Sequence, residues 1–139
     1  MNHLKKWQFY LLSFTFGLPL SLAGVLVCGV LVLCGYRVKR YGHLYYIAIG
    51  KSWGGLEFGW FFLVSIPEAE STKRHELGHG YQNACKYGLV MPVFWLIAAA
   101  RYWLRRFGAP IDYYAWWFEA EANDIGEKLM EHEKKEEAE

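Results

Sequence analysis

Cysteine and net charge are both scarce in this sequence. It contains three cysteines among 139 residues, and its formal net charge at pH 7 is +1. Cys28 and Cys34 lie in an apolar run, and Cys85 has no partner at the spacing of a metal or redox pair, so we expect no disulfide framework. No basic face interleaved with stacking aromatic residues stands out, so nucleic acid is not expected as a partner.

Charged side chains are missing altogether from residues 9–36. As a helix this run would measure about 42 Å, against roughly 30 Å of hydrocarbon in a bilayer. We therefore expect an N-terminal transmembrane helix, kinked or tilted near Gly17 and Pro19 because of its surplus length. A cleaved signal peptide is the alternative, but its apolar core would be shorter, and no convincing small-x-small cleavage site precedes Arg37.

Basic residues flank this apolar run on both sides, with a slight excess after it. By the positive-inside rule, that excess predicts that the remainder of the chain lies on the cytoplasmic side. We divide the sequence into a transmembrane anchor with basic flanks (1–40), a core (41–126) and a charged C-terminal tail (127–139). The tail is expected to be a solvated helix end.

Two runs rich in aromatic and β-branched residues, 44–49 and 56–65, follow the anchor. The glycine-rich segment between them, residues 50–55, is typical of a turn, so the sequence predicts a β-hairpin. Such a hairpin would either supply an edge strand to a site or merely cover the core.

Two helical segments are expected after the hairpin. The first should cover about residues 72–87, with Ser71 or Thr72 as its N-cap and a glycine at its end. The apolar stretch 89–100 is too short to cross a bilayer alone, so we expect a re-entrant, interfacial or buried helix. Arginine and aromatic residues within 101–106 are typical of a lipid headgroup boundary, although the arginines would also suit an acidic partner.

The segment His75-Glu76-Leu77-Gly78-His79 is the most informative motif, because it matches the HExxH pattern of zinc peptidases. Residues four apart lie on the same face of a helix, so His75 and His79 can direct both imidazoles at one metal ion. Glu76 lies about 100° around the helix, within reach of a metal-bound water. The alternative is a chance match, expected in roughly one or two per cent of chains of such composition.

A catalytic zinc needs a third protein ligand, and the histidine that supplies it in one large class is missing here. The corresponding positions hold Gln82 and Cys85. Cys85 could bind zinc in principle, but an uninterrupted helix rotates it roughly 240° away from His79.

A later helix, expected over residues 112–124 with Asp112 as its N-cap, offers Glu119 or Glu121 as the third ligand. The two side chains point about 200° apart, so only one can face the histidines. Spacing favours Glu119 only mildly: its neighbours one turn away are uncharged, whereas Asp124 lies one turn after Glu121.

With these residues in place, the chain resembles the gluzincin metallopeptidases, whose membrane-embedded branch carries a Glu-x-x-Ala-Asp motif well downstream of HExxH. Here the second motif reads Glu119-Ala120-Glu121-Ala122-Asn123. The similarity is greatest to the membrane-embedded branch, which includes the CAAX prenyl proteases and the heat-shock protease of the bacterial inner membrane. The order of segments looks still more like a group of small bacterial membrane proteins regarded as zinc peptidases.

This resemblance implies an integral membrane protein of the bacterial inner membrane, mainly α-helical with a small β-hairpin and an α+β zincin-like core. It implies Zn²⁺ bound by His75, His79 and Glu119, with Asn123 orienting a histidine as an uncharged hydrogen-bond acceptor. Zinc peptidases commonly place an edge strand beside the HExxH helix, where a substrate backbone adds as another strand. The implied partners are the lipid bilayer and a peptide or membrane-protein substrate, while the lack of further spans argues against prenyl-peptide activity.

The expected reaction is metal-assisted hydrolysis of a peptide bond. Zinc would activate a water, and Glu76 would accept its proton and pass it to the leaving amine. Two other classes remain open. Zinc could merely tie two helices together, which would make Glu76 dispensable, or the chain could be a small membrane subunit or regulator with an accidental HExxH.

Overall fold

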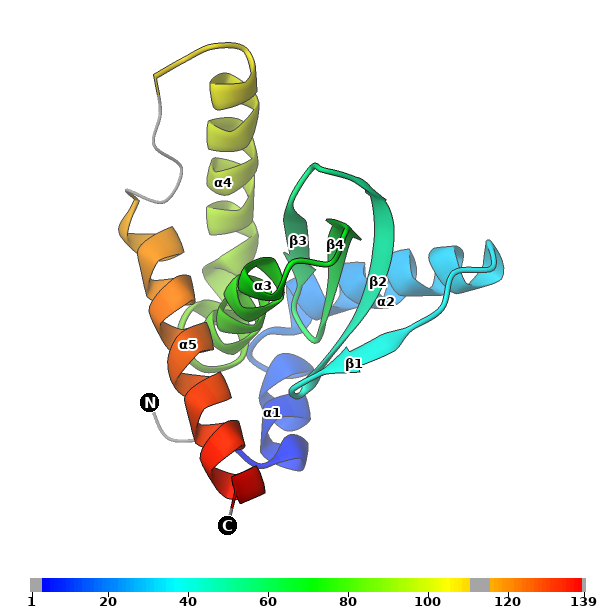
Figure 1. Ribbon diagram of the computed structural model, residues 1–139, viewed down its shortest axis with the longest axis vertical. Helices are drawn as coiled ribbons and strands as arrows, with labels where there is room; N and C mark the ends of the chain where they lie inside the picture. The colour runs from blue at the N-terminus through cyan, green and yellow to red at the C-terminus, as the bar shows by residue number, and fades with distance from the viewer. Residues whose placement is uncertain (1–3, 111–115, 139) are drawn as a thin grey trace.

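The computed structural model describes residues 4–110 and 116–138 and has a mixed α+β fold, with helices packed around one small sheet (Figure 1). Along the chain the elements are α1 (Lys6–Ser13), α2 (Leu18–Leu33), β1 (Lys39–Tyr41), β2 (Leu44–Lys51), β3 (Gly55–Phe58), β4 (Phe61–Ile66), α3 (Glu70–Gln82), a π-helical turn (Asn83–Tyr87), a 3₁₀ turn (Gly88–Val90), α4 (Met91–Arg106) and α5 (Trp117–Ala138). The strand order is β1-β2-β4-β3, which makes β1 and β3 the edge strands.

The N-terminal apolar run forms two helices rather than the single transmembrane helix expected from composition. The axes of α1 and α2 are bent by 99° across the break between them. The break falls where a kink was expected. Pro19 lies in the first turn of α2, and Gly17 packs so closely that a Cβ there would lie 2.3 Å from Nδ2 of Asn83. The close backbone contact at Gly17, together with Pro19, therefore produces a sharp bend between α1 and α2 instead of one tilted helix.

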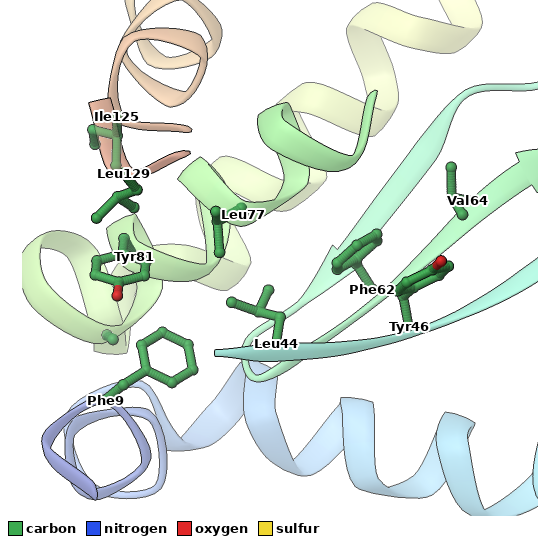
Figure 2. Packing of buried hydrophobic residues seen from close by; sticks show 10 residues of the cluster. Phe9, Leu44, Tyr46, Phe62, Val64, Leu77, Tyr81, Ile125 and Leu129 are labelled. Atoms are coloured by element: carbon green, nitrogen blue, oxygen red, sulfur yellow. The ribbon is translucent and has the colours of Figure 1, made fainter. Parts of the chain in front are cut away.

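The helix α1 belongs to the core of the molecule. Phe9 is fully buried, with its ring centroid 5.2 Å from that of Tyr81 in α3. Figure 2 shows Phe9, Leu44, Tyr81 and Leu129 gathered where α1, the sheet, α3 and α5 meet. One side of α1 is thus apolar because it packs against the rest of the chain, while Leu11 remains exposed.

The sheet corrects the predicted hairpin between residues 44–49 and 56–65. β2 pairs with β4 in parallel, so these two runs are not the arms of one hairpin. The second run instead folds back on itself as the hairpin β3–β4, closed by the pair Phe58↔Phe61. Gly59, with φ of +76°, makes the tight turn possible because glycine adopts positive φ without steric cost.

The helix α3 starts and ends earlier than the sequence predicted. It begins at Glu70 with Ala69 as its N-cap, so neither Ser71 nor Thr72 caps it. An acidic residue in the first turn is favourable there, because Glu70 faces the positive end of the helix dipole. The regular helix ends at Gln82 and continues as the π-helical turn. Asp112, the predicted N-cap of the later helix, lies outside the described residues.

Two helices present apolar side chains to the outside. The exposed large hydrophobic residues of α2 and α4 include Leu22, Leu26, Val30, Leu33, Val93, Leu96 and Leu104. Met91 is the buried residue of α4, so the alternative of a buried helix over 89–100 is wrong. One helical stretch, Glu70–Arg106, which joins α3 to α4, is long and apolar enough to cross a membrane by length and composition alone.

Candidate metal centre

The two histidines of HExxH and Glu119 meet at one buried point. Nε2 of His75 and Nε2 of His79 lie 2.8 Å and 2.9 Å from Oε2 of Glu119, and 3.0 Å from each other. All three residues are buried. The structure therefore brings together the three residues expected to bind a metal, and their ligand atoms, all within 4.8 Å of one another, could hold one ion.

The close approach of α3 and α5 builds this cluster. His75 and His79 are one turn apart on α3, and Glu119 lies in the first turn of α5. A Cβ on Gly78 would lie 1.8 Å from the carbonyl oxygen of Ala122, and one on Gly126 would lie 2.0 Å from that of Arg74. Backbone contact at these two glycines brings α3 and α5 side by side (Figure 1), so that the glutamate side chain can reach both imidazoles.

Both imidazoles are oriented through their outer nitrogens. Nδ1 of His75 lies 2.8 Å from Oδ1 of Asn123, and Nδ1 of His79 lies 2.7 Å from Oε1 of Gln82. Because amide oxygens only accept hydrogen bonds, each Nδ1 carries the proton and donates it. Each Nε2 then presents its lone pair to the cluster, as a metal-binding histidine does.

This arrangement places three acceptor atoms in mutual contact. Glu119 directs Oε2 at both Nε2 atoms, and with the protons on the Nδ1 atoms no proton lies between them. Its second oxygen, Oε1, is also buried, and it finds no hydrogen-bond partner among the described residues. A buried carboxylate with an unsatisfied oxygen is costly unless a cation is present. The residues therefore fit a bound metal ion.

Glu76 lies beside the cluster and faces a cavity of about 560 Å³. The cavity is bounded by β3, α3, α4 and Phe118, and Glu76 and His79 both line it. Glu76 is itself 4% exposed, and a Cβ on Gly55 would lie 2.6 Å from its Oε1. The edge strand β3 can lie against the HExxH helix because residue 55 has no side chain.

The sequence did not single out Glu57, which lines the same cavity. Its side chain is buried, it accepts a hydrogen bond from the backbone N–H of Gly59, and burial raises its pKa to about 8. The signal that could have revealed it is a lone carboxylate within an otherwise apolar strand run. Gln82 entered the sequence analysis only as a residue found where another class carries its third histidine, with no role assigned to it.

The rival ligands lie elsewhere. Glu121 points to the other side of α5, where its carboxylate contacts Gln82, Lys86 and Tyr87. Cys85 is half-buried and lines a separate cavity together with Lys86 and Glu121. The carboxylate that meets the histidines is that of Glu119.

Comparison of this chain with protein-family models, with curated proteins and with solved structures found no match.

Proposed function

We propose that this chain is a zinc-dependent peptidase held at a membrane, with His75, His79 and Glu119 as its metal ligands. The proposal depends on one observation above all, the convergence of two Nε2 atoms and Oε2 of Glu119 within 3.0 Å of one another. Two histidines and one glutamate, with the fourth position open to water, form a ligand set of catalytic zinc in peptidases.

Glu76 is the general base of the proposed reaction. When bound, zinc supplies Lewis acidity and lowers the pKa of a water molecule to about 7. Glu76 lines the cavity next to His79 without belonging to the ligand cluster, so its carboxylate is available to take the proton of the attacking water. It then donates that proton to the amine that leaves when the peptide bond breaks.

An extended peptide suits the space beside this group. β3 is an edge strand, and its side toward α3 and α4 borders the cavity. The backbone carbonyl of Glu57 points to that edge, where it accepts a hydrogen bond of 3.0 Å from Nε1 of Trp95 and keeps a second lone pair for a substrate N–H. A substrate backbone can pair with such an edge as an added strand while its side chains enter the largely apolar cavity.

Membrane attachment is supported by the outer surfaces of α2 and α4. Exposed leucine and valine side chains on both helices form apolar surface that a soluble domain would normally bury. Arg105 and Arg106, with Trp103, follow at the end of α4, as at a headgroup boundary. We propose the bacterial inner membrane as the location, with the site on its cytoplasmic side.

The test uses the purified full-length chain and its Glu76→Gln variant. We expect both to hold about one equivalent of zinc, and only the parent to cleave a library of unstructured peptides, read by mass spectrometry. Glu70→Gln, on the same helix but outside the cavity, is the matched control and should cleave as the parent does. A parent that holds zinc but cleaves nothing supports the structural-zinc alternative, and a parent without zinc removes the proposal altogether.

A further inference from the structure

Gln82 connects the proposed metal ligand His79 to α5. Its side chain is fully buried at the end of α3, outside the metal cluster. Its Oε1 lies 2.7 Å from Nδ1 of His79, and its Nε2 donates to the backbone oxygen of Phe118 and to Oε1 of Glu121, both at 3.0 Å. Every polar atom of the amide is therefore used.

The partners of Gln82 allow only one orientation of its amide. The carbonyl of Phe118 and the carboxylate of Glu121 can only accept hydrogen bonds, so the NH₂ group must face them. A flipped amide would set its oxygen against two acceptors in a buried place and leave all three groups without a proton to share. With the NH₂ group fixed, Oε1 faces His79 and holds the proton on Nδ1, which leaves Nε2 for the metal.

The π-helical turn after Gln82 serves this arrangement. In a π-turn, residues five apart share one side, and Tyr87 is five residues after Gln82. Oε1 of Glu121 accepts from Tyr87 at 3.0 Å, and Oε2 accepts from Lys86 at 3.1 Å. Three donors from α3 and the π-turn thus converge on one carboxylate and hold it against Gln82.

We propose that Gln82 is the positioning residue for His79, and that Glu121 sets the orientation of the Gln82 amide. The inference rests on the proposed function, because it explains why Nε2 of His79, the atom proposed to bind zinc, carries no proton. Glu121 then acts on the metal site from outside it. Helix α5 thus supplies the ligand Glu119 and also Glu121, which acts on the ligand His79 through Gln82.

The first experiment measures zinc affinity of the full-length chain by competition with a chromophoric chelator. Gln82→Met keeps the length of the side chain but removes the acceptor, and we expect zinc binding to weaken by about 10 to 100-fold. Lys128→Met is the matched control, since it removes a surface ion pair with Asp124 on α5 and leaves Gln82 and Glu121 untouched. Its affinity should stay within about twofold of the parent, as expected for a pair at the surface.

The second experiment is a double-mutant cycle that separates orientation from packing. Gln82→Glu can still accept from His79, but it sets a carboxylate against Glu121, so zinc binding should weaken. Adding Glu121→Gln supplies an amide donor to the new carboxylate. The double variant should therefore bind zinc about tenfold more tightly than Gln82→Glu alone, because the two positions are coupled. A purely structural role for Gln82 predicts no such rescue.

Each outcome decides one part of the inference. Parent-like zinc affinity in Gln82→Met overturns the role of Gln82. Additive effects in the cycle overturn the role of Glu121 while leaving that of Gln82. A parent that binds no zinc refutes the metal site itself, and with it the proposed function. If the parent binds zinc but the variants do not show the expected affinities, only this inference fails. Melting temperatures of the metal-free proteins identify any variant that has lost its fold.

Discussion

The α carbon of Gly78 lies directly against the backbone of Ala122, so that a Cβ on Gly78 would be 1.8 Å from the Ala122 carbonyl oxygen. Gly78 lies inside HExxH, and Ala122 lies about one turn after Glu119 near the start of α5. Their contact sets the separation of the two helices, and therefore whether one glutamate can reach both histidines. Gly78, at an x position of HExxH, therefore helps to shape the site together with the named residues of the motif.

A methyl group at position 78 should open the metal site. We expect Gly78→Ala to push α3 and α5 apart, to lower the free energy of unfolding by about 1 to 3 kcal/mol or more, and to weaken zinc binding strongly. Chemical denaturation and chelator competition measure the two effects. Gly29→Ala is the control, because a Cβ at Gly29 of α2 meets no atom within 4 Å. Equal behaviour of the two variants would show that the helices tolerate separation.

The part of the site that could be predicted from the sequence is the part fixed by local geometry. His75 and His79 are one helical turn apart wherever that helix lies, so their shared direction follows from spacing alone. The partner Glu119 was preferred to Glu121 mainly through a resemblance in its surrounding motif, since helical spacing separated the two only weakly. The role of Gln82 was missed because it depends on Phe118 and Glu121, which are far away in sequence, and Glu57 was missed because α3 and α4, which border its cavity, follow later in the chain.

The errors in the predicted fold also have a common cause, which is long-range pairing. The parallel pairing of β2 with β4 is not encoded in either strand, whose compositions suit a hairpin equally well. Likewise, apolar composition alone does not tell Phe9, which is buried in the core, from Leu26, which is 71% exposed on α2. Composition therefore predicted one helix where tertiary contacts produce two.

Membrane attachment should depend on the exposed apolar side of α2. We expect the full-length chain to stay in the membrane pellet after alkaline carbonate washing, because transfer of the exposed leucine and valine side chains from water into lipid lowers the free energy. Combined Leu26→Ser and Val30→Ser substitutions should move a substantial fraction to the supernatant. Ile66→Ser, at an exposed apolar position at the end of β4, should not. A parent chain found in the supernatant would contradict the attachment.

The buried carboxyl of Glu57 should make stability depend on pH in the metal-free protein. Burial raises its pKa from 4.5 to about 8, so folding favours the protonated form. That contribution to stability is complete below about pH 4.5 and is lost as the pH rises toward 8, by at most about 1.4 kcal/mol per pH unit. Glu57→Gln keeps an acceptor for Gly59 and has no proton to lose.

Denaturation in the presence of a chelator, at intervals from pH 5 to pH 9, measures this effect. The free energy of unfolding of Glu57→Gln relative to the parent should rise across the range and level off above about pH 8. Glu127→Gln, at an exposed position of α5, should follow the parent throughout. A constant difference between Glu57→Gln and the parent would show that Glu57 is already ionised in the folded chain at pH 5.

The identity of the third ligand is tested by removing one carboxylate from the buried cluster. Glu119→Ala leaves two protein ligands, so we expect the affinity for zinc to fall far more than the 10 to 100-fold loss typical of residues that only orient a ligand, such as Asn123. Cys85→Ser should bind zinc as the parent does, because Cys85 lies outside the cluster. In a crystal structure with zinc, an oxygen of Glu119 should lie about 2.0 to 2.2 Å from the metal. Retention of zinc by Glu119→Ala would mean that another residue completes the site, and the gluzincin resemblance would then lose its main support.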